Sequence, residues 1–453
     1  MRSGPLCPTI LTMALPSMIS FLITSIYNLA DTYFVSSLGT QATAAVSVNQ
    51  SLDMIIMMIG GLMGVGSGSL VSRLLGARES ESANRVLSTN FFLVAVFGLI
   101  LTGLGSLFIH PLVRLLGATP TCESYSIQYA TYVLLAAPFM ATSFVMNQCL
   151  RAEGSAMLSM IGMGFGGVLN CFLDPIFIFT LDLGVAGASM ATAISKFVSF
   201  CILVYPYLRR RSMLTLSVRN IRLEGKMLGE VVSIGSSSMF RSALGVVAGI
   251  VLNKLAGAIS DSVLASIGVC TKIMMFPFGI IIGFGQGFQP VAGFNWGARQ
   301  YARVRESYVI ASRIAFWGAA AMALLIGAFA NPLIRLFTES DTQMMEIGAL
   351  AIRLQCLMLP VHAWVAIVNM LCVGLGRARE AFLLATARQG TCFLPIVHLM
   401  TWAFGVYGIA SVQAVADLLT LALAFPIRAR LLRLISEAEE IERLAAAKEE
   451  REA

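Results

Sequence analysis

Two aspartates stand out in the sequence because each lies late in a long apolar stretch: Asp31 and Asp174. Asn170 precedes Asp174 by one helical turn and would share its face of a helix. An ionised group at the centre of a bilayer costs from about 2.5 kcal/mol upward on insertion scales, so acids inside a membrane are usually functional. Desolvation disfavours the charged form of a carboxyl group and so increases its affinity for a proton. Such a group can take up a proton and release it when its surroundings change. These residues predict reversible cation binding.

Two further polar residues extend this candidate set. Tyr129 and Thr192 come early in apolar stretches that would cross a membrane in the opposite direction to those of Asp31 and Asp174. Four helices would then bring polar groups to one level in its outer half. We therefore predict a site for reversible proton binding that is made of Asp31, Asn170, Asp174, Thr192 and Tyr129.

Structural explanations remain open for each of these acids. Asp31 could be a hydrated residue near the outer boundary of the membrane. Asp174 precedes Pro175, where the chain is biased away from helix, and could satisfy freed backbone groups. Asp53 is expected near the outer end of its apolar stretch. Asp417, His362 and Arg241 are secondary candidates that could instead be packed or paired within the fold.

Composition predicts that the apolar stretches cross a membrane. Hydrophobic residues make up 57% of the 453 residues, charged residues 12%, and the mean hydropathy is +0.81. A soluble protein is about half apolar and a quarter charged. Only helices and closed barrels satisfy their backbone in lipid, and helical spans need about 20 apolar residues where barrel strands need about ten. Because the apolar runs have helical length, we predict an all-α polytopic membrane protein.

Charged clusters and Gly/Pro punctuation divide the chain into twelve predicted transmembrane helices. They cover residues 8–36, 45–71, 86–109, 125–149, 156–180 and 185–207 in the first half, and 228–254, 263–291, 306–329, 344–373, 381–403 and 407–427 in the second. Basic residues are concentrated in the even-numbered gaps and after the last helix, whereas the odd-numbered gaps hold only Arg114, Lys254 and Arg335. Both termini should therefore be cytoplasmic.

The two halves are copies of one six-helix unit. Gly64-x-Gly66 followed by Gly76-Ala77-Arg78 returns as Gly285-x-Gly287 and Gly297-Ala298-Arg299, an offset of 285 minus 64, or 221, and Pro111-Leu-Val-Arg114 returns at the same offset as Pro332-Leu-Ile-Arg335. The expected domains are residues 1–208, a basic cytoplasmic linker at 209–226, residues 227–433 and a charged, solvated tail at 434–453. Two copies that cross six times each have the same orientation and can be related by an axis along the membrane normal, as in transporters.

The second copy serves as an internal control for the acids. Leu252 corresponds to Asp31 at the offset of 221, and Leu394 corresponds to Asp174 at an offset of 220. Carboxylates needed only for folding would more often have been kept in both copies. We therefore expect the cation chemistry in the N-terminal half.

Other functional classes are disfavoured by the same residues. The net charge of +7 is scattered through short loops without an aromatic-basic platform, so no nucleic-acid partner is expected. The nine cysteines form no CxxC pair and should be packing residues. The GxG pairs lack a preceding strand and a Gly-Lys-Ser/Thr, so they should allow close helix packing rather than bind nucleotides. Three scattered histidines provide no catalytic set, and we predict neither an enzyme nor a cofactor.

Several segments of the chain resemble the multidrug and toxic compound extrusion (MATE) transporters. The resemblance covers nearly the whole chain and rests on Asn28 to Gly39, Gly66 to Arg78, Leu150 to Gly154, Leu169 to Pro175, Gly287 to Pro290 and Asn295 to Ala298. It implies two six-helix lobes in a V. In the branch of this family with an acidic N-lobe site, the resemblance gives the roles of coupling H+ or Na+ to Asp31, Asn170, Asp174, Thr192 and Tyr129, with Tyr132 as the alternative to Tyr129. The C-lobe acids of the other branch are missing between Gly235 and Asn253 and between Ile347 and Cys372.

The resemblance implies an antiporter in a plasma membrane. The lack of large soluble additions to the chain fits a bacterial plasma membrane. It would export cationic or amphiphilic organic compounds in exchange for H+ or Na+ by alternating access, with membrane lipid around it and no obligate protein partner. A lipid-linked sugar flippase of the same superfamily is one alternative, although it should have a more cationic cavity. A dedicated metabolite exporter is the other.

Overall fold

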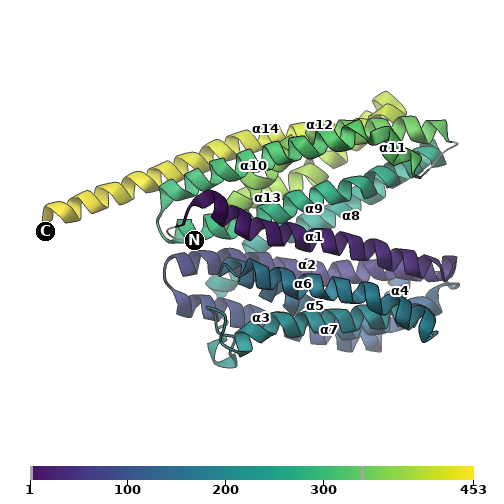
Figure 1. Cartoon of the computed structure of the whole chain (residues 1–453), viewed down its shortest axis with the longest axis horizontal. Helices are drawn as coiled ribbons and strands as arrows, with labels where there is room; N and C mark the ends of the chain where they lie inside the picture. Colours follow the sequence, from purple (N-terminus) through teal and green to yellow (C-terminus); the bar gives the residue numbers. More distant parts are fainter. Residues whose placement is uncertain (1–3, 338–340, 453) are drawn as a thin grey trace. The chain divides into compact units, whose positions relative to one another are not determined.

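The computed structural model describes residues 4–337 and 341–452, and every regular element in these residues is helical (Figure 1). The first half contains α1 (Leu6–Ser36), α2 (Thr40–Gly76), α3 (Ser80–Leu107), α4 (Ile109–Leu115), α5 (Glu123–Ala152), α6 (Ala156–Pro175), the π-helix η1 (Ile176–Thr180), α7 (Gly184–Leu208) and η2 (Val218–Asn220). The second contains α8 (Gly225–Ile259), α9 (Asp261–Gly297), α10 (Tyr301–Ala328), α11 (Ala330–Arg335), α12 (Thr342–Gly374), α13 (Ala378–Thr386), the π-helix η3 (Ala387–Thr391) and α14 (Phe393–Glu452).

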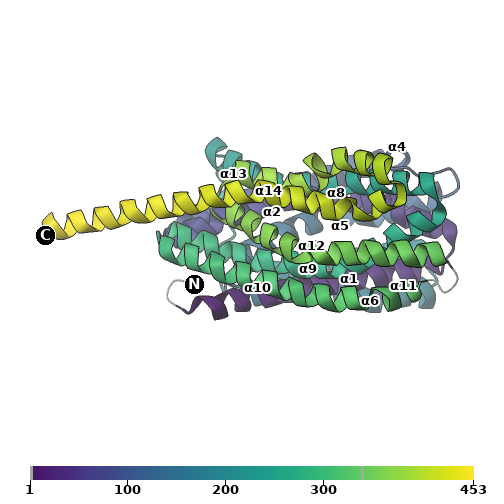
Figure 2. The ribbon, with the colours of Figure 1, turned by 90° about the horizontal axis from the view of Figure 1, so that it is seen from above.

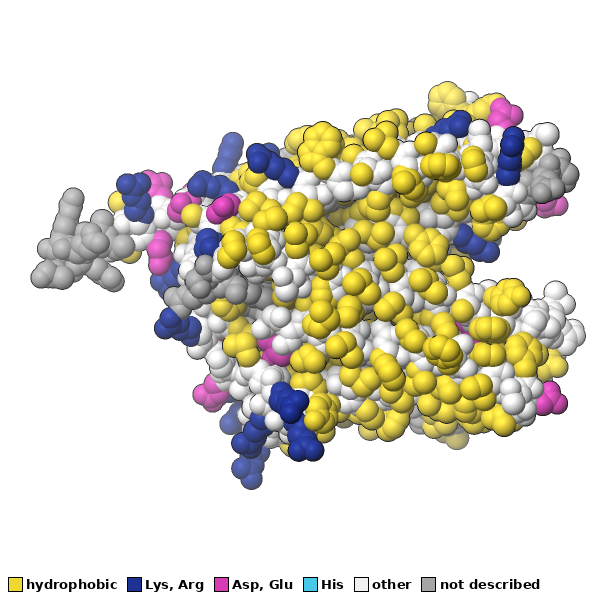
Figure 3. Space-filling model, in the orientation of Figure 1, with side chains coloured by type: hydrophobic (Ala, Val, Ile, Leu, Met, Phe, Trp, Pro, Cys, Tyr) yellow, Lys and Arg dark blue, Asp and Glu magenta, His cyan; other side chains and the backbone are white. Residues whose placement is uncertain are grey.

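The helices confirm the predicted all-α membrane architecture. Eleven continuous helical segments are long and apolar enough to span a bilayer, and the last of them, Ala378–Ala445, contains two of the predicted spans. Gly405 separates those two spans with φ 54° and ψ −124°, a conformation that is accessible to glycine without steric cost. The described residues therefore form twelve spans. Figure 3 shows hydrophobic side chains covering the visible faces of the helices, with most Lys and Arg near helix ends.

The repeated Gly-Ala-Arg motif ends the second helix of each copy in the same way. Arg78 and Arg299 both have positive φ, 65° and 57°. The backbone N–H of Arg78 donates to the carbonyl of Leu75, and that of Arg299 donates to the carbonyl of Trp296, so donor and acceptor both keep the offset of 221. The motif is therefore a helix C-cap that satisfies the last carbonyl groups. The repeated Pro-Leu-x-Arg motif forms the short helices α4 and α11, which the span prediction did not include.

A repeated asparagine links neighbouring helices in each copy. The Asn147 side chain on α5 donates to the carbonyl of Ser159 on α6 at 3.2 Å, and that of Asn369 on α12 donates to the carbonyl of Ala381 on α13 at 2.8 Å. The two donors, 147 and 369, and the two acceptors, 159 and 381, are separated by the same offset of 222. Because a buried carbonyl without a partner is costly in lipid, these intramembrane asparagines have a structural role.

The chain folds into two units, which divide at equivalent positions of the repeat. The N-unit comprises Leu15–Gly235, and the C-unit comprises Met1–Ala14 with Ser236–Ala453. Each division lies inside the first helix of a copy, α1 or α8, and the two divisions are related by the offset of 221. The start of each first helix thus belongs to the unit built mainly by the other copy.

Two repeated glycines allow these exchanged helix starts to pack. A Cβ added at Gly66 on α2 would lie 2.7 Å from the carbonyl carbon of Val231 on α8, within the N-unit. One added at Gly287 on α9 would lie 2.6 Å from the backbone nitrogen of Ala14 on α1, within the C-unit. Gly66 and Gly287 are equivalent in the repeat, so the predicted close helix approach is confirmed in both copies. The contacted residues are not equivalent, since Val231 corresponds to Ile10 at the offset of 221 and Ala14 lies four residues further along.

The linker and the tail each pack on one unit. Ser212 in the linker donates to the Glu153 carboxylate at 2.5 Å, and the backbone N–H of Arg222 donates to the Thr89 hydroxyl at 2.9 Å, all within the N-unit. The tail continues α14 as a helix that extends past α10 and α12 of the C-unit (Figure 2). Its Glu442 lies 3.7 Å from Arg299, a partly exposed ion pair of small energetic weight.

Candidate functional site

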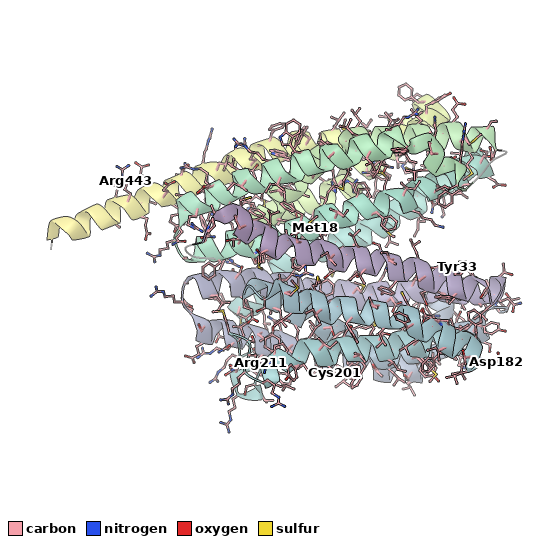
Figure 4. All side chains as sticks on the ribbon, in the orientation of Figure 1. Met18, Tyr33, Asp182, Cys201, Arg211 and Arg443 are labelled. Carbon is pink, nitrogen blue, oxygen red and sulfur yellow. The ribbon has the colours of Figure 1, made fainter. Side chains whose placement is uncertain are left out.

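The candidate site residues lie at similar depths in the helices of the N-unit. Asp31 is five residues before the end of α1, Asp174 six before the end of η1, and Tyr129 six after the start of α5. Thr192 is eight residues into α7. At a rise of 1.5 Å per residue, all four lie about 8–12 Å from the same ends of their helices. In Figure 4 these ends are marked by Tyr33 and Asp182, opposite the end of the unit marked by Arg211.

Asn170 joins α6 to α7 through side-chain hydrogen bonds. Its amide nitrogen lies 3.1 Å from Oδ1 of Asp174 and 3.3 Å from the hydroxyl of Thr192. Asn170 is 2% exposed and Asp174 is fully buried. Oδ2 of Asp174 and Oδ1 of Asn170 are buried without a hydrogen-bond partner in the structure. Two acceptor oxygens are therefore available to a proton or a cation, and the backbone-satisfying role considered for Asp174 is not observed.

Tyr129 contributes to the same region from α5. Thr192 and the charges of Asp31 and Asp53 all act electrostatically on its phenol. Its backbone carbonyl accepts a 2.6 Å hydrogen bond from Ser189, which fixes α7 against α5. Tyr129 is 3% exposed. The structure thus brings Asn170, Asp174, Thr192 and Tyr129 together.

A lysine that sequence reasoning did not select also belongs to this region. Nζ of Lys196 on α7 donates to the Tyr27 hydroxyl on α1 at 3.1 Å and lies 4.9 Å from the centre of its ring. The charge of Lys196 acts on both Asp31 and Asp53. The sequence did contain a signal, because Lys196 is the only Lys or Arg inside the six predicted spans of the first half and lies one turn after Thr192.

Asp53 lies deeper in its helix than the sequence suggested. Because α2 begins at Thr40 rather than at residue 45, Asp53 is thirteen residues, or about 20 Å, from the start of that helix. Its Oδ1 is buried and, within residues 4–337 and 341–452, has no hydrogen-bond partner; the same holds for Oδ1 of Asp31. Asp31 and Asp53 also interact electrostatically with each other. Asp53 therefore belongs with the candidate site.

The charges of this site do not balance. The site holds three carboxyl groups, those of Asp31, Asp53 and Asp174, and one ammonium group, that of Lys196, which acts on Asp31 and Asp53. Fully ionised, three negative charges and one positive charge leave a net charge of −2. Uncompensated charge in a low-dielectric interior is costly, so this arrangement favours the uptake of cations.

The equivalent residues of the C-unit are apolar and pack together. Ala248, Leu252 and Leu394 correspond to Tyr27, Asp31 and Asp174 at offsets of 221, 221 and 220. Ala248 is part of a buried cluster with Phe393 and Val397, and Leu252 and Leu394 pack against it. The same positions of the fold can therefore be filled by hydrocarbon, which argues against a purely structural need for the carboxyl groups.

The secondary candidates Asp417, His362 and Arg241 all lie in the C-unit. Oδ1 of Asp417 accepts a 2.7 Å hydrogen bond from Nε of Arg388 on η3 and a 3.3 Å bond from Gln413. Pairing with a neighbouring helix, the alternative considered for Asp417, is thus observed. Arg388 was another residue that sequence reasoning missed, although it is a charged residue inside the predicted span 381–403.

Comparisons with known proteins agree over most of the chain. Residues 16–176 and 238–397 match the family model described as MatE. The multidrug export protein MepA of Staphylococcus aureus is 29% identical over 411 residues, covering 90% of each chain, and MepA of Staphylococcus haemolyticus is 28% identical over 423 residues, covering 92% of this chain and 93% of its own. An outward-facing multidrug resistance transporter of the MATE family has a TM-score of 0.90 at 26% identity, covering 96% of this chain and 97% of its own.

Proposed function

Because the chain belongs to the MATE family of membrane transporters, we propose that it is a secondary antiporter that exports organic cations or amphiphiles in exchange for H+ or Na+. The compounds would leave the cell across the plasma membrane, with both termini of the chain in the cytoplasm. Multidrug export is the activity in the names of the MepA relatives. We extend this activity to the present chain, in which both halves match the MatE family model.

The excess of carboxyl groups in the N-unit is the observation that carries this proposal. The site has three carboxyl groups, those of Asp31, Asp53 and Asp174, against the one ammonium group of Lys196. Oδ2 of Asp174 is buried and has no hydrogen-bond partner among the described residues. A monovalent cation bound at Asp31, Asn170 and Asp174 would lower the net negative charge and satisfy these oxygens. Carboxylate and amide oxygens are suitable ligands for Na+, and a carboxylate oxygen can equally accept a proton.

Coupling requires that the ion distinguishes two states of the protein. An ion that binds one state ten-fold more tightly than the other shifts their equilibrium by ten-fold, about 1.4 kcal/mol. Asn170 links Asp174 to Thr192 across α6 and α7, so cation binding at Asp174 can change the contact between these helices. The π-helix η1 directly follows Asp174 and Pro175, and π-turns are frequent at functional sites. We propose that occupancy of this site favours the state that releases the exported compound.

The two alternative functions, a lipid-linked sugar flippase and a dedicated metabolite exporter, require different properties of the same site. A lipid-linked sugar flippase would need basic residues for a pyrophosphate, whereas the N-unit cluster has an acidic excess. A dedicated metabolite exporter could use the same cation coupling and would differ in its range of substrates. A panel of unrelated cationic dyes separates this last possibility from multidrug export.

Uptake of a fluorescent cationic dye into inverted membrane vesicles tests the proposal. A pH gradient and a Na+ gradient are applied in turn, and the gradient that drives uptake identifies the coupling ion. Asp31→Asn should reduce gradient-driven uptake at least about ten-fold, because the amide cannot take up a proton and binds a cation weakly. An Asp31→Asn protein that exports dye at the full rate would contradict the proposed coupling.

Asp182→Asn provides a matched control in the same unit. Asp182 is exposed in the turn before α7 and has φ 52°, a conformation that asparagine tolerates well. The substitution removes one negative charge without altering the buried cluster. It should leave both the rate and the ion dependence of uptake unchanged.

A further inference from the structure

The C-unit contains a second buried charged cluster, with the opposite sign to that of the N-unit. Arg241 on α8 and Arg388 on η3 both act electrostatically on His362 of α12. Asp417 on α14 is paired with Arg388. With the imidazole uncharged, two guanidinium groups and one carboxylate leave a net charge of +1. Burying that charge without a counter-ion is unfavourable.

Arg388 is held in a defined orientation with part of its hydrogen-bonding capacity unused. Its Nε donates to Asp417, and its guanidinium carbon lies 4.4 Å from the ring centre of Phe278 on α9. Its Nη2 is buried and has no hydrogen-bond partner among the residues that the structure describes. Stacking on an aromatic ring and an ion pair together fix the plane of the guanidinium group. The free Nη2 can therefore present an N–H to a ligand in a fixed direction.

Arg241 adds further donors to this cluster, and His362 adds a ring nitrogen that donates in one tautomer and accepts in the other. The His362 ring packs edge-on against Phe278 at 5.2 Å, and its Nε2 is buried without a partner. Arg241 donates a side-chain hydrogen bond of 3.4 Å to Ser238 on the same helix. Buried donors are normally satisfied by protein, water or ligand. Water would supply hydrogen bonds but not the missing negative charge.

We propose that Arg388, Arg241 and His362 form a subsite of the C-unit for the carboxylate of an exported organic compound. The inference rests on the proposed function, because it takes the ligand to be a transported molecule. One carboxylate balances the single excess positive charge, whereas a phosphate monoester carries about two negative charges. The planar guanidinium group matches the plane of a carboxylate and binds it through charge-assisted hydrogen bonds. The side chain of Arg388 is 15% exposed while its Nη2 is buried, so a carboxylate would reach Nη2 by displacing the groups that cover it.

The subsite lies at positions where the repeat has changed its chemistry. Gly184-Val185 and Gly405-Val406 keep the offset of 221 at the turn before the last span of each copy. By that offset Asp417 corresponds to Lys196, so an acid has replaced a base. Arg388 lies on the π-helix η3, just as Asp174 lies immediately before Pro175 and the π-helix η1. Each unit thus combines a buried charged cluster with a π-helix, and the net charges of the two clusters have opposite signs.

Two dyes with the same chromophore provide the test: tetramethylrhodamine with a free carboxylate, and its methyl ester. Binding to the purified full-length protein is measured by fluorescence anisotropy. Arg241→Gln leaves the pair of Arg388 and Asp417 in place, and Arg388→Lys keeps the charge but loses the second donor arm. Both variants should weaken binding of the carboxylate dye at least about ten-fold and that of the ester less than about two-fold.

Arg335→Gln is the matched control, since Arg335 is an exposed arginine of α11 in the same unit. It should change the affinity for neither dye. Equal weakening of both dyes in Arg241→Gln and Arg388→Lys would overturn the subsite and indicate a structural role. No binding of the carboxylate dye to the unaltered protein would overturn it as well. Gradient-driven uptake of the ester tests the proposed export separately, because the ester lacks the group that the subsite recognises.

Discussion

Replacing Gly66 by alanine should destabilise the N-unit, because its Cβ would meet the backbone of α8. The Cβ would lie 2.7 Å from the carbonyl carbon of Val231, against 3.4 Å or more in ordinary contact. The contacting atoms belong to backbone and cannot rotate away. Overpacking costs about 1–3 kcal/mol, and a contact with rigid backbone falls in the upper part of that range, about 2–3 kcal/mol, while alanine gains about 1 kcal/mol of helix propensity. The expected net loss is about 1–2 kcal/mol.

This loss should appear as a lower melting temperature of about 2–8 °C for a unit of this size. All four tryptophans follow residue 295 and report on the C-unit alone. A thiol-reactive fluorogenic maleimide is therefore the better probe, because the buried Cys122 and Cys149 of the N-unit become reactive on unfolding. Gly287→Ala, the equivalent change, should give a similar loss that tryptophan fluorescence also detects.

Gly103→Ala and Gly318→Ala are matched controls, one in each unit. Both glycines lie inside helices, and a Cβ at either position would have no neighbour within 4 Å. These variants should be as stable as the unaltered protein or slightly more stable. If Gly66→Ala melts at the same temperature as Gly103→Ala, the exchanged start of α8 does not pack on α2 as described.

Two other substitutions test charges at different depths. Lys196→Met removes the ammonium group that attracts Asp31 and Asp53, so the coupling ion should bind about ten-fold more tightly and half-maximal dye uptake should require a lower ion concentration. Lys272→Met, at an exposed position of α9, is the control and should not change the ion dependence. An unaltered ion dependence in Lys196→Met would contradict the role assigned to Lys196. At the start of α12, the hydroxyl of Ser262 at 2.5 Å and the backbone N–H of Met344 at 2.9 Å hold the pKa of Asp341 below its usual range. The contribution of the ionised Asp341 to stability is therefore present at neutral pH and lost as the pH falls below about 4. Melting curves from about pH 3 to 7 should show a lower melting temperature for Asp341→Asn than for the unaltered protein only at the higher pH values. A difference in melting temperature that stays constant with pH would refute this linkage.

The opposite net charges of the two buried clusters, one in each unit, follow from a few departures from the repeat. Where the N-unit has Tyr27, Asp31 and Asp174, the C-unit has alanine and two leucines that join an apolar cluster. Features that both copies need, such as the caps at Arg78 and Arg299, kept their residues and their hydrogen bonds. The duplicated fold thus supports different chemistry in its two halves.

Hydropathy and repetition alone determined the number of spans, the two copies and the importance of Asp31 and Asp174. These properties are local, because each span must be apolar over its own length whatever it packs against. The glycine pattern likewise predicted close helix packing, but only the fold showed that Gly66 and Gly287 contact the exchanged helix starts.

The partners of the charged residues were decided by the tertiary structure. Lys196 meets Tyr27 across 169 residues of chain, and Arg388 meets Asp417 across 29. Such pairs depend on how each helix is rotated about its axis, and π-turns such as η1 and η3 change that rotation by a fraction of a turn. Since hydropathy is almost insensitive to that rotation, the sequence located the charges within their spans, and only helix packing determined which of them neutralise one another.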